Sequence, residues 1–216
     1  MKILLFLAAS ISMAFVASLA QAADRFLPDT KFVDQAGHSF SFASLRGKNV
    51  VLSFIYTRCR DTNECPLISA KFAQLQDRLD AKTHLVEVTI DPAYDRPAVL
   101  ATYAKAYGFR PDRVTLITGE PSQVLEFART LGVNAFTDPK YGFIHNENTV
   151  IADASGRVIE MFPESSWTVD EIVSVLAHRN SPHFNWNAVD IAAFVAVILA
   201  AVWIVGRVVR AVARER

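Results

Sequence analysis

The fold is decided by residues 49–66, which read NVVLSFIYTRCRDTNECP. Residues 49–56 form an unbroken, mostly apolar run, as is typical of strands buried on both faces of a parallel sheet. Pro66 suits the first position of a helix, where its missing N–H would have no partner, and the apolar spacing predicts that this helix continues to Leu79. A strand, a loop with two cysteines and a helix therefore follow one another, which is the building unit of an α/β fold.

The rest of residues 23–179 repeats this alternation of short apolar runs and amphipathic stretches. After an early hairpin turn at residues 34–37, we expect strands at 84–90 and 114–117, helices at 96–107, 121–131 and 168–176, and a late hairpin with strands at 148–152 and 157–162. This order predicts a thioredoxin-like α/β fold. A generic doubly wound fold, which would lack the late hairpin, is the second choice.

The composition bounds the number of domains and the kind of partner. With 216 residues, 51% of them apolar, the chain can bury one ordinary core, so residues 23–179 are expected to form a single domain. The 22 basic and 22 acidic residues cancel. We therefore expect no nucleic-acid partner.

Both ends of the sequence predict export and membrane attachment. Residues 1–22 have a basic start, an apolar run and a small-x-small end, as in a signal peptide; an uncleaved anchor is the alternative. Residues 188–209 are apolar and long enough for a transmembrane helix, with a polar linker at 180–187 and a basic tail at 210–216. A surface-lying helix is disfavoured because the run has no polar stripe. The arginines place the tail in the cytoplasm, which predicts an inner-membrane protein with its domain in the periplasm.

The sequence around the cysteines favours thiolates. A helix N-terminus stabilises negative charge, so Cys65, which precedes Pro66, is expected to gain most. Arg58 and Arg60 place positive charge beside Cys59 and are expected to lower the pKa of its thiol.

Three interpretations of Cys59 and Cys65 remain open on the residues alone. A structural disulfide is compatible with an exported protein. However, a disulfide that closes a loop of only five intervening residues stabilises the fold little, because it removes little chain entropy from the unfolded state. A redox-active pair in thioredoxin-like proteins usually has two intervening residues. Two soft thiolates with a third ligand would instead select Cu(I), or Cu(II) when the third ligand is an imidazole.

A third ligand would have to come from one of five histidines. His38 lies in the first turn, His84 begins a strand, His178 lies near a helix C-terminus and His183 lies in the linker. His145 follows a turn-rich segment and precedes the late hairpin, in a loop that can face the cysteine loop. Taken alone, such a loop histidine is more often solvated than bound to a metal.

The sequence resembles the Sco/SenC family of copper-binding proteins over roughly residues 26–176. The matching stretches are FIYTRC at 54–59 with CPL at 65–67, VTIDP at 88–92 with Asp95, LITG at 116–119, and FIHN at 143–146 ahead of VIADASG at 150–156. The first pair resembles the cysteine motif of that family, and the last resembles the place where the family keeps its ligand histidine.

The resemblance implies a thioredoxin-like fold in which Cys59, Cys65 and His145 bind copper. Asp91 is a candidate for orienting one of these ligands; the alternative is an ordinary acid at the end of a strand. The resemblance also implies a metallochaperone for the CuA site of cytochrome c oxidase, so the expected partner is the oxidase subunit that holds this copper, or another copper protein. The alternatives are a periplasmic thiol-disulfide oxidoreductase and, more weakly, a peroxiredoxin-like peroxidase. The chain departs from the family in having five residues between its cysteines, where three is commonest, and in having its anchor at the C-terminal end.

Overall fold

The computed structural model describes residues 25–138 and 142–180. The chain divides into two compact units, residues 1–174 and 175–216. The sheet and the candidate site belong to the first unit.

The predicted ends of the chain lie almost entirely outside the described residues. This holds for the signal peptide (1–22), the transmembrane helix (188–209), the tail (210–216) and the linker (180–187) except its first residue. Among the residues that are described, no helix is both long and apolar enough to cross a membrane.

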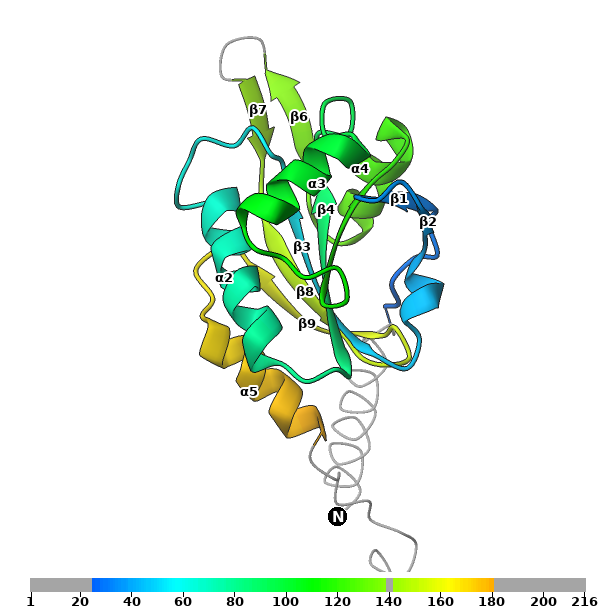
Figure 1. Ribbon diagram of the computed structural model, residues 1–216, viewed down its shortest axis with the longest axis vertical. Coiled ribbons are helices and arrows are strands. Elements are labelled where there is room, and N and C mark those ends of the chain that lie inside the picture. The colour runs from blue at the N-terminus through cyan, green and yellow to red at the C-terminus, as the bar shows by residue number, and fades with distance from the viewer. Residues whose placement is uncertain (1–24, 139–141, 181–216) are drawn as a thin grey trace, which may run out of the picture. The chain divides into compact units, whose positions relative to one another are not determined.

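A mixed sheet of seven strands forms the centre of the first unit (Figure 1). Its strands are β1 (Phe32–Asp34), β2 (Ser39–Phe40), β3 (Asn49–Ile55), β4 (Thr83–Thr89), β5 (Val114–Thr118), β8 (Asn148–Ala152) and β9 (Val158–Pro163). They lie in the order β2-β1-β5-β4-β3-β8-β9. β3 is parallel to β4 and antiparallel to β8, which forms the predicted late hairpin with β9. The hairpin distinguishes this sheet from the generic doubly wound alternative.

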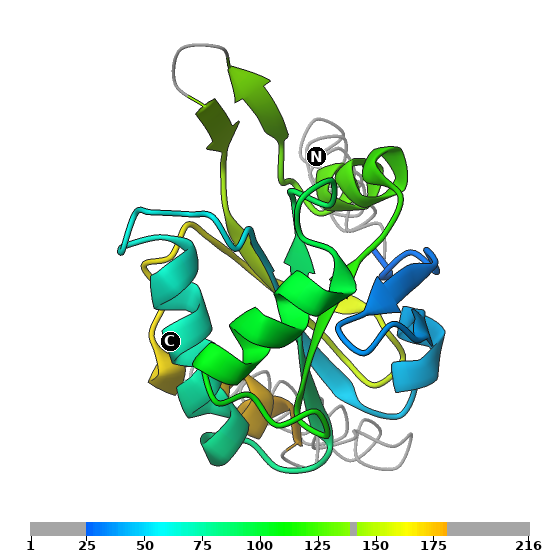
Figure 2. The ribbon, with the colours of Figure 1, turned by 45° about the horizontal axis from the view of Figure 1, so that its top comes forward.

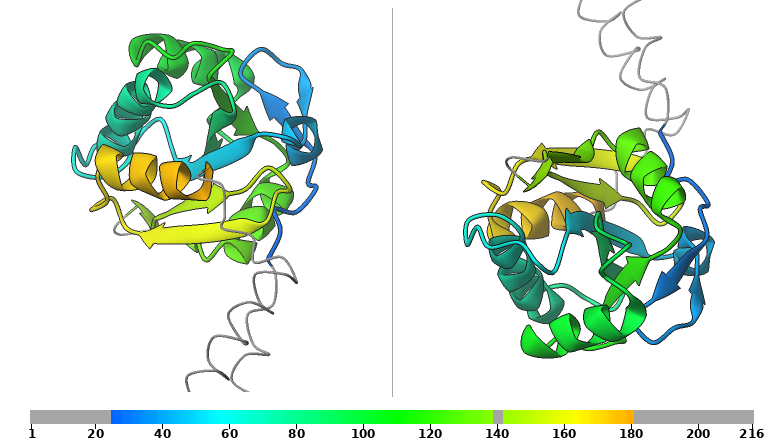
Figure 3. Two further views of the ribbon diagram at one scale, coloured as in Figure 1. Left: turned by 90° about the horizontal axis from the view of Figure 1, so that it is seen from below. Right: turned by 90° about the horizontal axis from the view of Figure 1, so that it is seen from above.

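The helices lie on both faces of this sheet. They are α2 (Cys65–Arg78), α3 (Pro97–Ala106), α4 (Pro121–Thr130) and α5 (Val169–Asn180), with a short 3₁₀ helix η1 (Phe42–Leu45). Figure 3 shows α2 and α3 on one face and α4 on the other. The connections from β3 to β4 and from β4 to β5 join parallel strands and run in the same direction across the sheet, so right-handed crossovers place α2 and α3 on the same face.

The side chains of β3 alternate between two apolar cores. Leu52 and Phe54 belong to the cluster that includes Phe127 of α4, and the ring centroids of Phe54 and Phe127 are 6.1 Å apart. Val51 and Ile55, both fully buried, point the other way, to the face covered by α2 and α3. Because β3 is packed on both faces, its end fixes the position at which the following loop begins.

Two further strands form a ribbon of their own (Figure 2). β6 (Ala135–Asp138) pairs antiparallel with β7 (Gly142–His145), and Ala135 lies opposite His145. The prediction of a loop at His145 is therefore wrong, because this residue ends a strand. Strands of four residues next to turn-forming side chains are too short for alternation to reveal them.

Candidate metal centre

The cysteine loop connects the buried end of β3 to the first turn of α2 (Figure 2). The loop is folded by its own turns: the amides of Asn63 and Glu64 donate to the side-chain and main-chain oxygens of Asp61, at 2.9 and 3.2 Å. The hydroxyl of Ser165, from the segment between β9 and α5, donates to the carbonyl oxygen of Asn63 at 2.7 Å. A distant part of the chain therefore also holds the loop.

A buried acid, Asp95, fixes the beginning of the loop. It is 0% exposed. Its carboxyl group accepts hydrogen bonds from the amide of Thr57 at 3.0 Å, from the hydroxyl of Thr57, and from the hydroxyl of Thr89 at 2.5 Å. These contacts join the loop to the end of β4 and set the position from which Cys59 projects.

Asp91 also acts on the loop, through Arg58. The Nε and Nη2 atoms of Arg58 donate to Asp91 Oδ2 at 3.0 and 2.5 Å, and the guanidinium lies 4.2 Å from the centre of the Tyr94 ring. The pKa of Cys59 is lowered, as predicted, but hydrogen bonds involving Cys65, Asp61 and Tyr56 are its main causes, and the charge of Arg58 is paired with Asp91. Asp91 itself contacts the residue before Cys59.

The two cysteines are free, and their thiols differ sharply in environment. Cys59 is half-buried and Cys65, the first residue of α2, is fully buried. A hydrogen bond between the two sulfur atoms lowers the pKa of Cys59 to about 6, and the same hydrogen bond together with burial raises the pKa of Cys65. The prediction that Cys65 gains most is therefore wrong, because its burial and its sulfur partner outweigh the helix N-terminus.

His145 lies at the end of β7 with its side chain only 4% exposed. Its ring packs edge-on against Tyr56, with the centroids 5.4 Å apart. Its Nε2 atom is 3.6 Å from Oε2 of Glu64 in the cysteine loop. The prediction that the segment around His145 faces the cysteine loop is confirmed.

A carboxyl group that the sequence analysis missed completes the cluster. The ligand atoms of Cys65, His145 and Glu147 all lie within 4.8 Å of one another. Glu147 is 8% exposed, and burial, with the nearby charges of Glu64 and Cys59, raises its pKa to about 7. In extended chain, residues two apart point to the same side, so the spacing of His145 and Glu147 was the signal that could have found it.

Comparison with known proteins identifies the family. The family model described as SCO1/SenC matches residues 19–180. The chain belongs to the SCO1/SenC family. Among its curated relatives is the SCO1 protein homolog of Bacillus subtilis, which is 30% identical over 151 residues, 66% of this chain and 77% of the relative.

Solved structures of SCO1/SenC members share the fold. ScoI of Bradyrhizobium japonicum with copper bound gives a TM-score of 0.60 at 23% identity, covering 71% of this chain and 99% of ScoI. BsSco, described as having a disulfide switch and as a member of the Sco family of cytochrome c oxidase assembly proteins, gives 0.63 at 24% identity, covering 72% and 94%. The predicted thioredoxin-like fold is confirmed by these likenesses.

In this SCO1/SenC member, the residues between the cysteines bring a carboxyl group to the site. Glu64 immediately precedes α2, and its Oε2 atom lies 3.8 Å from Cys59 Sγ as well as 3.6 Å from His145 Nε2. The side chain is 43% exposed. Glu64 therefore links the half-buried cysteine to the histidine from the solvent side.

A hollow of about 370 Å³ adjoins the cluster. It is lined by Glu64, His145, Asn146, Glu147, Glu164 and Ser165. A small ion could reach His145 and Glu147 through this hollow. Three of its lining residues are glutamates, so the approach is acidic.

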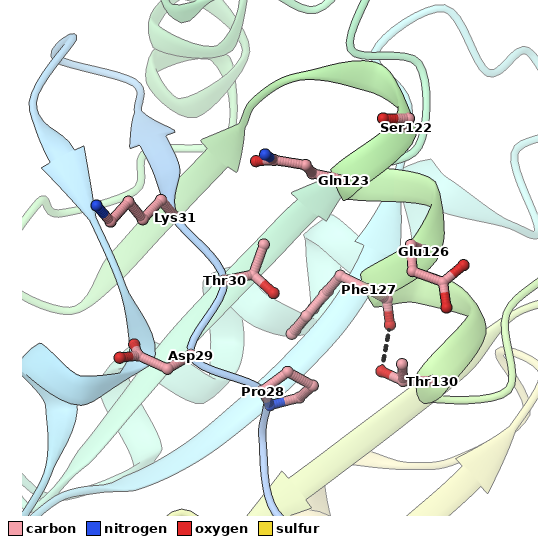
Figure 4. A pocket seen from close by; sticks show the side chains of 9 residues that line it. All are labelled: Pro28, Asp29, Thr30, Lys31, Ser122, Gln123, Glu126, Phe127 and Thr130. Carbon is pink, nitrogen blue, oxygen red and sulfur yellow. Dashed lines mark hydrogen bonds between the residues drawn. The ribbon is translucent and has the colours of Figure 1, made fainter.

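A second hollow, of about 570 Å³, is built from other elements (Figure 4). It is lined by Pro28, Asp29, Thr30, Lys31, Ser122, Gln123, Glu126, Phe127 and Thr130. This set contains no cysteine or histidine, so the second hollow offers no thiolate or imidazole to a metal ion.

Proposed function

We propose that this SCO1/SenC member binds copper through Cys59, Cys65 and His145 and delivers it to the CuA site of a cytochrome c oxidase. One observation carries the proposal: the sulfur of Cys65 and a ring nitrogen of His145 lie within 4.8 Å of one another. Copper bound in ScoI and the oxidase-assembly description of BsSco support it.

The donor set suits copper as cargo. Thiolates are soft ligands that select Cu(I), and an imidazole extends the range to Cu(II). Cys59 and Cys65 come from a loop and a helix start, whereas His145 comes from the ribbon. The ion would therefore bridge two separate parts of the fold.

Binding requires the thiols to be reduced and to lose their protons. Cys59 is the partly exposed sulfur and meets an incoming ion first. Cys65 is fully buried and would lose its proton when its sulfur binds the positive ion. Copper uptake is therefore coupled to proton release and to the redox state of the pair.

Copper titration of the full reduced chain in detergent tests the proposal. We expect Cys59→Ser and Cys65→Ser to abolish stoichiometric uptake, and His145→Ala to weaken binding at least about tenfold. His38→Ala is the matched control because its side chain is 78% exposed in the first turn. Equal copper affinity in wild type and His145→Ala would refute the three-ligand site. Failure of loaded chain to transfer copper to the soluble oxidase copper domain would refute delivery.

The second candidate is a thiol-disulfide oxidoreductase, favoured by the pairing of a partly exposed Cys59 with a buried Cys65. The Cys59 thiolate would attack a disulfide of the client to form a mixed disulfide and release one client thiolate. Cys65 would then attack Cys59, releasing the second client thiol and leaving a Cys59–Cys65 disulfide. An insulin reduction assay separates the candidates, because His145→Ala should leave reduction unchanged.

We also propose that residues 188–209 hold the domain at the periplasmic face of the inner membrane. Truncation after residue 187 should move the protein from the membrane fraction to the periplasmic fraction. Protease added outside the inner membrane should digest the domain of the intact protein. A domain that stays protected would overturn this orientation.

A further inference from the structure

We propose that Glu147 is a fourth copper ligand and that it favours Cu(II) over Cu(I). The proposal rests on the proposed function, because it adds a donor to the same site. It concerns a residue that the resemblance to the Sco/SenC family does not mark, since Glu147 lies between the two matching stretches that surround it.

The distances fit one ion. Three donor atoms arranged evenly around one ion at about 2.0–2.3 Å lie about 3.5–4.0 Å apart. The nearest ligand atoms of Cys65, His145 and Glu147 all lie within 4.8 Å of one another before any ion is added. An inward shift of at most about 0.8 Å by each atom therefore places all three around one centre.

The carboxyl group of Glu147 is buried with one oxygen unused. The residue is 8% exposed, and Oε1 is inaccessible and has no hydrogen-bond partner. A buried polar atom without a partner costs about 1–3 kcal/mol. An ion between Glu147 and the sulfur of Cys65 would remove this cost.

The main chain holds Glu147 in this orientation. Its carbonyl oxygen accepts from the amide of Glu164 at 2.9 Å. The next residue, Asn148, begins β8 and donates through Nδ2 to the carbonyl of Leu131 at 2.9 Å. The backbone from which the Glu147 side chain extends is therefore held in place.

A carboxylate changes which copper ion the site prefers. Carboxylate oxygen is a hard ligand, whereas Cu(I) prefers sulfur. With both thiolates ionised, an added carboxylate also increases the negative charge, which attracts a divalent ion more than a monovalent one. Glu147 should therefore strengthen Cu(II) binding and leave Cu(I) binding almost unchanged.

Glu64 is the competing carboxylate. Its Oε2 atom is near Cys59 and His145, but its side chain is 43% exposed and solvated from outside. Buried Glu147 lies with Cys65 and His145 on the inner side. The two acids can be told apart by separate substitution.

The test compares Cu(II) and Cu(I) affinity of the full chain carrying Glu147→Gln or Glu147→Leu, the second of which removes every donor atom. We expect each variant to weaken Cu(II) binding at least about tenfold, to change the copper hyperfine splitting in the electron paramagnetic resonance spectrum, and to keep the wild-type Cu(I) affinity. Glu164→Gln is the matched control, because it removes an exposed carboxyl group from the same hollow.

The outcomes separate this inference from the proposed function. If the Glu147 variants keep wild-type Cu(II) affinity and spectrum while His145→Ala loses copper, Glu147 is not a ligand and the three-ligand site stands. If Glu64→Gln alone reproduces the expected loss, the fourth ligand is Glu64 and the inference is overturned. If wild type binds no copper, the proposed function itself fails.

Discussion

Two buried carboxyl groups lie near the cysteine loop, and they differ in whether their oxygen atoms have hydrogen-bond partners. Asp95 is 0% exposed and accepts hydrogen bonds from the amide and hydroxyl of Thr57 and the hydroxyl of Thr89. Glu147 is nearly as buried, yet its Oε1 atom has no partner. A fully satisfied acid fixes the backbone, whereas an unsatisfied acid next to a thiol and an imidazole is ready for an ion.

The largest effect on stability is expected at the satisfied acid. Asp95→Ala leaves the donors of Thr57 and Thr89 without an acceptor, so we expect the free energy of unfolding to fall by about 3–5 kcal/mol. Urea denaturation measures this loss. Asp29→Ala, at an exposed acid, is the control and should change stability by less than about 0.5 kcal/mol. A loss below about 1 kcal/mol at Asp95 would show that the loop has other anchors.

A third buried acid, Glu87, sharpens the comparison because it is unsatisfied but lies on β4, outside the ligand cluster. It is 0% exposed, neither carboxyl oxygen has a hydrogen-bond partner, and burial raises its pKa from 4.5 to about 8. The folded chain therefore holds this proton more tightly than the unfolded chain. Its contribution to stability is complete below about pH 4.5 and is lost as the pH rises through about 8.

Glu87→Gln should remove this dependence. Since a full proton difference amounts to about 1.4 kcal/mol per pH unit, and the difference is nearly one proton over this range, wild type should lose about 2.5 kcal/mol relative to the variant between pH 5 and pH 7. Urea denaturation at the two pH values provides the measurement. Glu160→Gln, at an exposed position of β9, should follow wild type. Parallel curves for wild type and Glu87→Gln would mean that Glu87 is not held neutral.

The smallest effect on stability is expected for the partly exposed ion pair at the beginning of the cysteine loop. Arg58 pairs with Asp91, but its side chain is 54% exposed, so Arg58→Ala should destabilise the chain by at most about 1 kcal/mol. The exposed pair of Arg129 and Glu126 on α4 supplies the control, Arg129→Ala, with an expected loss of about 0.5 kcal/mol or less. A loss at Arg58 well above 1 kcal/mol would place it among the main anchors of the loop.

Much of the fold was predictable because its signals are local. The run at residues 49–56, the prolines that begin helices and the turn before β9 predicted most elements to within a few residues. The ribbon was missed, because β6 and β7 have four residues each and their pairing joins Ala135 to His145, ten residues away.

The site was predictable only in part, because its chemistry depends on contacts between distant residues. The cysteine pair was visible in the loop, and His145 came from the family resemblance. The prediction that the Cys65 thiolate is more stabilised than that of Cys59 was wrong, since nothing in the local sequence indicates that Cys65 is fully buried. The engagement of Arg58 by Asp91 joins residues 33 positions apart and could not be read from the loop.

The ribbon that carries His145 has a kinetic consequence. Among the described residues, β6 and β7 pair only with one another, and a two-stranded hairpin is marginally stable by itself, so the ribbon depends on the packing of Ala135 and Phe143 against the core. An ion bound by both His145 and the cysteines would connect the ribbon to the cysteine loop. Copper binding would therefore disfavour opening of the ribbon, and opening would weaken copper binding. If copper binds as proposed, opening of the ribbon would free the ion while the seven-stranded sheet stays folded, and ribbon opening would then limit the rate of copper release. Slower hydrogen exchange at the Ile144 amide on loading would report that connection.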